Sequence, residues 1–490
     1  MDLRLCMPMC KRVINTDISE DIILPDYYPE IRRVLCVREN MLPVAKFISG
    51  NKIDISGVVD YTLIYVSSEG MLCSAPLSAE YAFSVPLDNA NDFELSEGVN
   101  IMAHSVADSS TVRVSGPRKL QIRSHIRSNV NAWGKMSCCE SVEGIEDPAS
   151  IQRLEAEGMC AEMLCESSDI VTVSDQYTLP SDNARIAVAD SAVTIQSARM
   201  DGEMIYASGE VIVGMLIITD GKSEKVVRRI PFEAESDLDG VEMDGEKLLR
   251  INGEVTELTI NVEEGNALIE ANLVLEICMV QNRSINYICD AYSTEQSSVT
   301  DMKSYMLPIV LENKNTSFSQ NERAEISELN FTEGSDIIDV YGSAAVSEAA
   351  FEEGKYVIRG NCRYNIICLK DGEYSHCELR VPFRYESDGE YEIDGFDASA
   401  QVIGCKVRND GDFLSVDSEI VLSYNIMGSR ETEMLQRVTF FDRTEACGGE
   451  WTVCYVQNGQ SAWNIAKKYG VRECDVKGDP ATDRYVIIER

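Results

Sequence analysis

The fold is decided by the stretch Gly57-Val58-Val59-Asp60-Tyr61-Thr62-Leu63-Ile64-Tyr65. Apolar and mostly polar residues alternate along it, which is the period of a strand with one buried face. Related stretches begin at Gly209 and Gly360, so the three leading glycines lie 152 and 151 residues apart. A constant period of about one domain length predicts duplicated β-rich domains.

Each copy is expected to form a long hairpin. The second copy runs into Asp220-Gly221 and the third into Asp371-Gly372, and Asp-Gly between alternating strands is a strong hairpin signal. The first copy turns at Glu69-Gly70. A phenylalanine follows the leading glycine after 23 residues in the second and third copies, and after 26 in the first, at Phe83. A glycine inside a strand predicts a bulge or a close backbone approach.

The segments ahead of the first two hairpins are harder to interpret. Pro29 followed by Ile31, Val34 and Leu35 predicts a short amphipathic helix. Residues 148–165 show a weaker helical spacing that a glycine interrupts, and we interpret them as the approach to the second repeat. Because the linkers are short, we expect the three repeats to stack in a semi-rigid rod, with a hinge at 445–450 before the tail.

The last forty residues differ from the rest of the chain. One apolar stripe there, at positions i, i+3, i+4 and i+7, predicts a two-turn helix; it consists of Ala462, Ile465, Ala466 and Tyr469. Ser461 precedes the stripe as an N-cap and Gly470 follows it as a left-handed C-terminal residue. Short strands are expected at 452–456 and 485–488. Trp463 lies off the stripe, so we expect it to be partly exposed.

Length and charge bound the class of protein. A chain of 490 residues with 44% hydrophobic content predicts three or four folded domains. The tail carries six Lys/Arg against five Asp/Glu, whereas the preceding 450 residues carry 38 against 77. A body with a net charge of −39 repels nucleic acid and anionic lipid, so we expect no nucleic-acid partner.

Membrane insertion and export are not expected either. No apolar run approaches the roughly 20 residues of a membrane span. The first ten residues contain Asp2 and Arg4 and no sustained apolar core, unlike a signal peptide. Seventeen scattered cysteines without Cys-x-x-Cys spacing favour reduced thiols in a cytosol.

The sequence predicts neither catalytic residues nor a cofactor. His104, His125 and His376 lie in no catalytic motif, and neither a phosphate-binding loop nor a Gly-x-Ser-x-Gly elbow occurs. With 82 carboxylates some pair could reach a glycosidase spacing by chance, so a hydrolase stays an alternative.

The best metal candidate also points to structural thiols. It combines Cys362, Cys368, His376 and Cys377. The Asp371-Gly372 turn would place Cys377 opposite Ile366 and diagonal to Cys368, with His376 on the other face. That arrangement breaks a four-ligand cluster, so we expect no metal and buried thiols that pack as small apolar groups.

Two family resemblances follow from these motifs. The block Leu24-Pro25 to Leu35, the glycine-led hairpin, the element 116–120 and Asp290-Ala291-Tyr292-Ser293-Thr294 resemble the SPOCS domain of spore-coat proteins. Residues 455–471 resemble a LysM domain, although Gly459-Gln460-Ser461 replaces the usual Gly-Asp-Thr. Three SPOCS repeats before one LysM domain is the order of the SipL-like spore-envelope proteins. The resemblance implies repeats at 15–165, 166–318 and 319–444, sandwich-like and mainly β, and an α+β LysM domain at 450–490.

This resemblance implies a role in sporulation. It makes the chain a non-enzymatic adaptor of spore coat morphogenesis in the mother-cell cytoplasm, at the forespore surface. Its tail would bind the coat basement-layer scaffold ATPase, a protein like stage IV sporulation protein A, and the repeats would offer surfaces to other coat proteins. The expected partner-binding residues in the tail are Trp463, Ile465, Lys467, Lys468 and Tyr469. The alternative is binding of peptidoglycan, an N-acetylglucosamine polymer, through the LysM domain.

Overall fold

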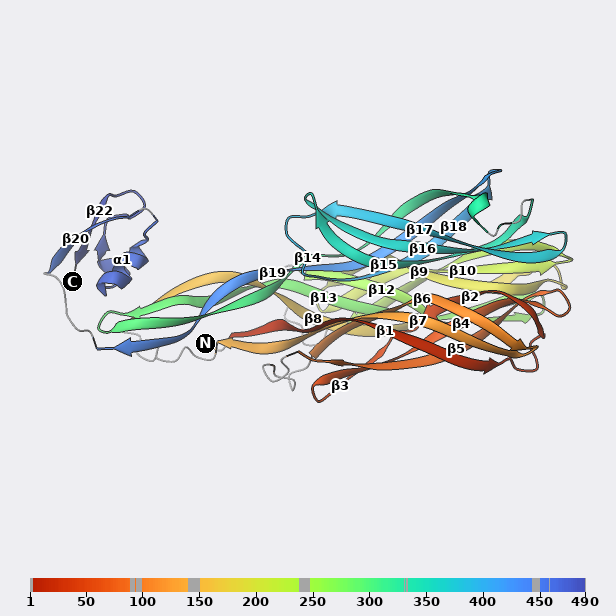
Figure 1. Cartoon of the computed structure of the whole chain (residues 1–490), viewed down its shortest axis with the longest axis horizontal. Helices are drawn as coiled ribbons and strands as arrows, with labels where there is room; N and C mark the ends of the chain where they lie inside the picture. Colours follow the sequence, from red (N-terminus) through yellow and green to blue (C-terminus); the bar gives the residue numbers. More distant parts are fainter. Residues whose placement is uncertain are drawn as a thin grey trace.

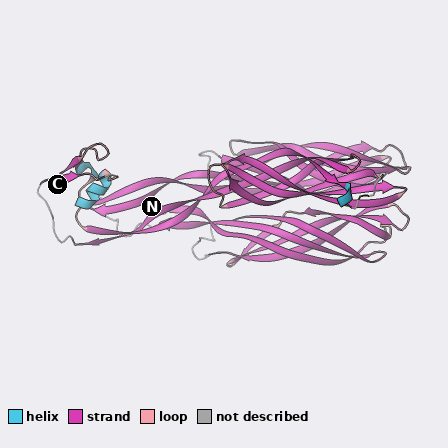
Figure 2. Ribbon diagram, turned by 45° about the horizontal axis from the view of Figure 1, so that its top comes forward, coloured by secondary structure: helices cyan, strands magenta, loops and turns pink. Residues whose placement is uncertain are grey.

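The computed structural model describes residues 3–88, 93, 99–139, 150–237, 247–329, 331, 334–442, 450–457 and 459–489. Within these ranges the protein is mainly β, built from antiparallel sheets, with one short α-helix near the C-terminus (Figures 1 and 2). None of the helices in these ranges has the length and apolar character needed to cross a membrane.

Strand pairing divides the body into three units of the same topology. In each unit the first strand pairs with the last strand, which pairs with the one before it. The middle strands form a second sheet, which has four strands in the first unit and three in each of the other two. This order of pairing recurs three times along the described chain, and each recurrence contains one of the glycine-led hairpins.

The strands of the three units are as follows. Unit 1 has the sheets β1-β7-β6 (Leu3–Ile23, Lys119–Cys139, Val99–Gly116) and β2-β4-β5 (Ile31–Met41, Lys52–Ser67, Leu72–Pro86), with the extra strand β3 (Ala45–Ser49) beside β4. Unit 2 has β8-β13-β12 (Ile151–Thr178, Asn266–Ser293, Lys247–Glu263) and β9-β10-β11 (Arg185–Asp201, Met204–Thr219, Lys222–Asp237). Unit 3 has β14-β19-β18 (Ser297–Glu325, Phe413–Phe441, Gly395–Asn409) and β15-β16-β17 (Asp336–Glu352, Lys355–Lys370, Glu373–Asp388), with a 3₁₀ turn at Ile326–Glu328.

The boundaries between the three units differ from the repeat boundaries expected from the sequence. The expected boundary at 165/166 falls inside β8, and the one at 318/319 falls inside β14. The two sheets of each unit pack on a common core; in unit 1, for example, Tyr61 of β4 and Ile122 of β7 share one cluster.

The three hairpins form as predicted. Asp220 and Gly221 both have positive φ, as do Asp371 and Gly372, which is the backbone of a two-residue turn that matches the twist of the strands. In the first copy the turn is longer, since Val66 pairs with Leu72.

Each leading glycine lies directly opposite an aromatic ring. Gly209 pairs with Phe232 and Gly360 with Phe383, whereas Gly57 pairs with Tyr81 and not with Phe83. A Cβ atom on any of these glycines would collide with the ring of its partner. At Gly209 and Gly360 it would also collide with a backbone carbonyl, so the expected close backbone approach is found at these two glycines. The irregular spacing in the first copy arises because Tyr81, not Phe83, is the equivalent aromatic residue.

The helix predicted after Pro29 is wrong, because those residues form β2. Two bulges interrupt its pairing with β4, between Ile31 and Arg33 and between Val34 and Cys36. Each bulge inserts one residue, so apolar residues that would recur every two positions recur every three and imitate a helix. Segment 148–165, whose spacing also hinted at a helix, enters β8 at Ile151.

The three units lie side by side around a shared centre, so the expectation that they stack in a semi-rigid rod is wrong (Figure 1). One buried cluster draws side chains from all three units; it contains Cys36, Ile64, Leu72, Ala187, Val188, Leu216, Ile218 and Ile367. A second buried cluster is also shared by the three units, and it includes Leu5 of β1, Ile285 of β13 and Leu307 of β14.

Buried charges join the units beside the shared centre. The guanidinium of Arg38, in unit 1, lies 2.7 Å from Asp339 of unit 3 and 3.5 Å from Asp190 of unit 2. Lys225 of unit 2 lies 2.6 Å from each of these two carboxylates. We call Arg38, Asp190, Lys225 and Asp339 the central charge cluster. Since it balances two positive against two negative charges, its burial leaves no net charge uncompensated.

The longest strands carry the tail. β8, β13, β14 and β19 span 28 or 29 residues each and project beyond the other strands as an arm (Figure 1). The C-terminal tail lies at the far end of this arm. The expected hinge at 445–450 lies outside the described residues except for Glu450.

Candidate functional site

The tail is a small α+β module. Strands β20 (Trp451–Tyr455), β21 (Val476–Lys477) and β22 (Tyr485–Glu489) form one sheet, which α1 (Ala462–Tyr469) and a 3₁₀ turn (Glu473–Asp475) cover. The predicted helix, its caps and both strands are confirmed. The Ser461 side chain accepts a hydrogen bond from the backbone of Asn464, and Gly470 closes α1 with φ 65°.

The helix of the tail docks on the end of β13. The indole nitrogen of Trp463 donates a hydrogen bond to Asp290 Oδ2 at 2.8 Å, and Lys467 Nζ lies 2.5 Å from Asp290 Oδ1. The Trp463 ring stands edge-on to Tyr292, with ring centroids 4.8 Å apart. The Tyr292 hydroxyl donates to the backbone oxygen of Val471 at 2.7 Å. We call these contacts the arm–tail dock.

An irregularity in the pairing of β13 positions the side chains that form the arm–tail dock. A register shift between Ile288 and Asp290 marks a bulge at Cys289, and a bulge re-aims the side chains beside it. Tyr292 is only 1% exposed, and burial raises the pKa of its hydroxyl, which stays a hydrogen-bond donor. Asp290 and Tyr292 belong to segment 290–294, which the sequence analysis compared with the SPOCS domain. No residue pattern within this segment indicates that it would contact the tail.

The dock changes what the expected partner-binding residues can do. Trp463 is 5% exposed, so the expectation that it is partly exposed is wrong: its ring covers Tyr292 instead of facing solvent. Ile465 is fully buried in the core of the tail. Lys467 pairs with Asp290, and Tyr469 is partly buried against the same core. Lys468 alone of the five is exposed, with its ammonium 5.6 Å from the ring centre of Tyr469.

The opposite side of the tail is apolar and open. Alternate residues of β20 and β22 point away from α1 and are exposed; they are Trp451, Val453, Tyr455, Tyr485 and Ile487. The sequence analysis missed them, although the i, i+2, i+4 spacing of Trp451, Val453 and Tyr455 was a visible signal.

The body offers less for chemistry. A cavity of ≈ 290 Å³ between the units is lined by His104, Glu254, Gln401 and others. Burial, with a smaller effect from Glu276, raises the pKa of Glu254 to about 8. A single protonated carboxyl can donate a proton, but a hydrolytic site also needs a nucleophile and a base placed beside the substrate.

The thiol cluster has the predicted register. Cys377 pairs with Ile366, and Cys368 pairs with Ser375. Burial raises the pKa of Cys368 to about 12 and that of Cys377 to about 11, so both thiols stay protonated within one apolar cluster. His376 instead meets the Asn365 side chain at 2.9 Å. Over the residues described, no group of three or more His, Cys, Asp or Glu side chains is arranged to hold a metal.

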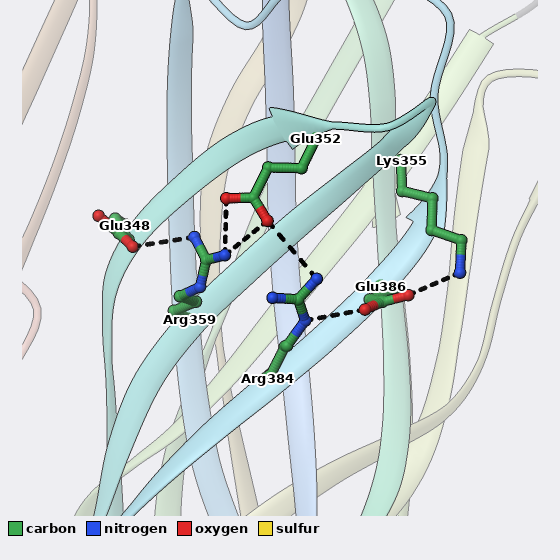
Figure 3. A network of polar contacts seen from close by, with 6 residues as sticks. All are labelled: Glu348, Glu352, Lys355, Arg359, Arg384 and Glu386. Atoms are coloured by element: carbon green, nitrogen blue, oxygen red, sulfur yellow. Dashed lines mark hydrogen bonds and ion pairs between the residues drawn. The ribbon is translucent and has the colours of Figure 1, made fainter.

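A charged network on the second sheet of unit 3 is also structural. Figure 3 shows its members, which are Glu348, Glu352, Lys355, Arg359, Arg384 and Glu386. Arg359 donates to Glu352 at 2.6 Å, and Arg384 donates to Glu386 at 2.8 Å. Water and salt screen exposed ion pairs of this kind, so they contribute little to stability, and every cation in the network already has a carboxylate.

Comparisons of this chain with protein-family models, with curated proteins and with solved structures give no match. Fold and site describe a mainly β protein whose longest strands carry a small docked module, with one short helix, at the end of an arm.

Proposed function

We propose that this protein is a non-enzymatic adaptor of spore-envelope assembly, in which three SPOCS-like, sandwich-like units carry a LysM-like tail. The tail binds the scaffold ATPase of the coat basement layer, a protein like stage IV sporulation protein A, in the mother-cell cytoplasm. The observation that carries the proposal is the position of the tail. It is a separate folded module at the far end of the arm, and one of its faces is apolar and exposed.

The body supports this role as a carrier. Its shared apolar clusters and its central charge cluster join the three units into one block, so the arm has a firm base. Its excess of acidic residues keeps the block soluble and repels other acidic surfaces. A firm, acidic body with a near-neutral tail suits a protein that recruits by contact.

Co-precipitation from sporulating cells tests the proposal. The full chain is expected to capture the scaffold ATPase, and a chain that ends at Glu450 is expected to lose it while its far-UV circular dichroism still reports folded sheets. Equal capture by both chains would contradict the proposal. Retention of the full chain on purified peptidoglycan, lost with the tail, would favour glycan binding instead, and release of muropeptides would show a hydrolase.

A further inference from the structure

The outer side of the tail sheet carries a group of exposed apolar residues, bordered by the exposed ion pair of Lys477 and Glu489, whose charged atoms lie 4.0 Å apart. Its members have exposed fractions of 61% for Trp451, 67% for Val453, 53% for Tyr455, 54% for Tyr485 and 42% for Ile487. We call these five residues the sheet face. Scattered exposed apolar residues need no explanation, but a group of five on 40 residues of chain does.

Strand register places four of the five residues in two cross-strand pairs, while Trp451 stands opposite Glu489. Val453 pairs with Ile487 and Tyr455 with Tyr485, so their side chains stand beside each other on one side of the sheet. The two tyrosine rings meet with centroids 5.3 Å apart. The residues between them in sequence, such as Val486 and Ile488, are fully buried beneath α1. The sheet is therefore apolar on both sides, although its own core needs only one.

We propose that the sheet face, and not α1, is the surface of the tail that binds the partner protein. This inference rests on the proposed function and names the part of the tail that performs it. α1 is not free for that task, since Trp463 and Lys467 are engaged by Asp290 while the sheet face stays open.

Composition and size suit a protein partner. Tryptophan, tyrosine and arginine are the residues that most often dominate binding energy at interfaces. The sheet face has one tryptophan and two tyrosines, and the guanidinium of Arg484 lies 5.7 Å from the ring centre of Tyr455. With about 150–250 Å² per aromatic side chain, half-exposed, the face offers on the order of 500 Å². With a polar rim, that approaches the roughly 800 Å² which each partner contributes to a standard interface.

Charge selects the kind of occupant. A second copy of this chain would bring a further net charge of −38, and an anionic membrane would be repelled by the same acidic body. A glycan needs many hydrogen bonds, whereas the five side chains offer one indole N–H and two hydroxyls, and the bordering Lys477 and Glu489 pair with each other. The occupant that fits is a protein surface with an apolar centre, on a partner without excess negative charge.

Binding of the purified scaffold ATPase to the immobilised full chain tests the inference. The informative variants are Trp451→Ala, which removes the largest side chain of the sheet face, and Val453→Lys, which places a charge at its centre. The matched control is Val13→Lys, at a body valine that is 60% exposed on β1. Lys468→Ala probes the exposed side of α1. Far-UV circular dichroism and thermal melting confirm that each variant is folded.

We expect Trp451→Ala and Val453→Lys each to weaken the dissociation constant at least about tenfold, and the Val13 and Lys468 variants to bind within about twofold of the parent chain. Normal binding by both sheet-face variants, with loss in Lys468→Ala, would overturn the inference and leave the proposed function standing. No binding by the parent chain would refute the proposed function and the inference with it. A dimer of the parent chain that Val453→Lys abolishes, or retention on peptidoglycan that it abolishes, would assign the sheet face to another occupant and overturn the inference too.

Discussion

Replacing Arg38 by methionine tests whether the central charge cluster holds the three units together. Arg38 Nη2 lies 2.7 Å from Asp339 Oδ2, and both side chains are buried, at 4% and 0% exposed. Burial alone would raise the pKa of Asp339, but the charges of Arg38 and Lys225 hold it below its ordinary value, so the carboxylate is ionised in the folded chain. Arg38→Met therefore leaves a buried anion with one cation in place of two.

The expected cost follows from that loss. Removing one partner of a buried ion pair costs about 3–5 kcal/mol, and the Lys225 ammonium remains 2.6 Å from Asp339, so we expect the lower end, about 3 kcal/mol. Urea denaturation followed by circular dichroism measures the change in unfolding free energy. Arg12→Met is the matched control, because Arg12 Nη2 also lies 2.7 Å from a carboxylate, Asp88, but both side chains are about half exposed. Its cost should stay below about 1 kcal/mol.

A double variant separates charge from packing. Arg38→Met with Asp339→Leu removes one charge of each sign and keeps the 2.6 Å pair of Lys225 with Asp190. Replacing a buried pair by apolar groups is often neutral, so we expect most of the lost stability to return. Equal costs for Arg38→Met and Arg12→Met would refute the reasoning, and failure of the double variant to recover would attribute the loss to packing.

Three further outcomes are expected elsewhere in the body. Gly209→Ala should lower unfolding free energy by about 1–3 kcal/mol in urea titrations, since its Cβ would press on a carbonyl and a ring, whereas Gly404→Ala, with nothing within 4 Å, should not. Glu254 keeps its proton in the folded chain up to about pH 8 but ionises near its ordinary pKa when unfolded, so the free energy of unfolding should fall as pH rises between these two pKa values. Glu254→Gln should flatten the plot of melting temperature against pH in this range, and an unchanged slope would contradict the raised pKa of Glu254. Asp290→Ala should release the tail, seen as faster tryptic removal of the tail from the folded body, and unchanged cleavage would show that Tyr292 alone suffices.

The hairpins were predictable because their determinants are local. Alternation sets which side of a strand is buried, and Asp-Gly sets the turn, so the register of the second and third hairpins follows without knowledge of the rest of the molecule. The pairing of Cys377 with Ile366 confirms this at the level of single residues. The same holds for α1, whose stripe and caps lie within ten residues.

Prediction failed where an extra residue or a distant contact intervened. The bulges in β2 changed the apparent period of Ile31 and Val34, so a strand looked like a helix. Trp463 looked exposed because its partner, Asp290, lies 173 residues away in the sequence. The periodicity of apolar residues predicts neither the bulges nor the contact of Trp463 with Asp290, since both depend on which segments meet in the folded chain.

By itself the sequence determined that this chain is mainly β, that it forms three glycine-led hairpins and that its tail contains a capped helix, because alternation, turns and caps act over a few residues. Only the tertiary structure decided that the units lie side by side around buried charges, and that α1 faces the arm while the sheet face stays open. Those outcomes depend on contacts between segments more than a hundred residues apart in the sequence. Local patterns show that a surface is apolar or charged, but only long-range packing decides which of these surfaces becomes buried.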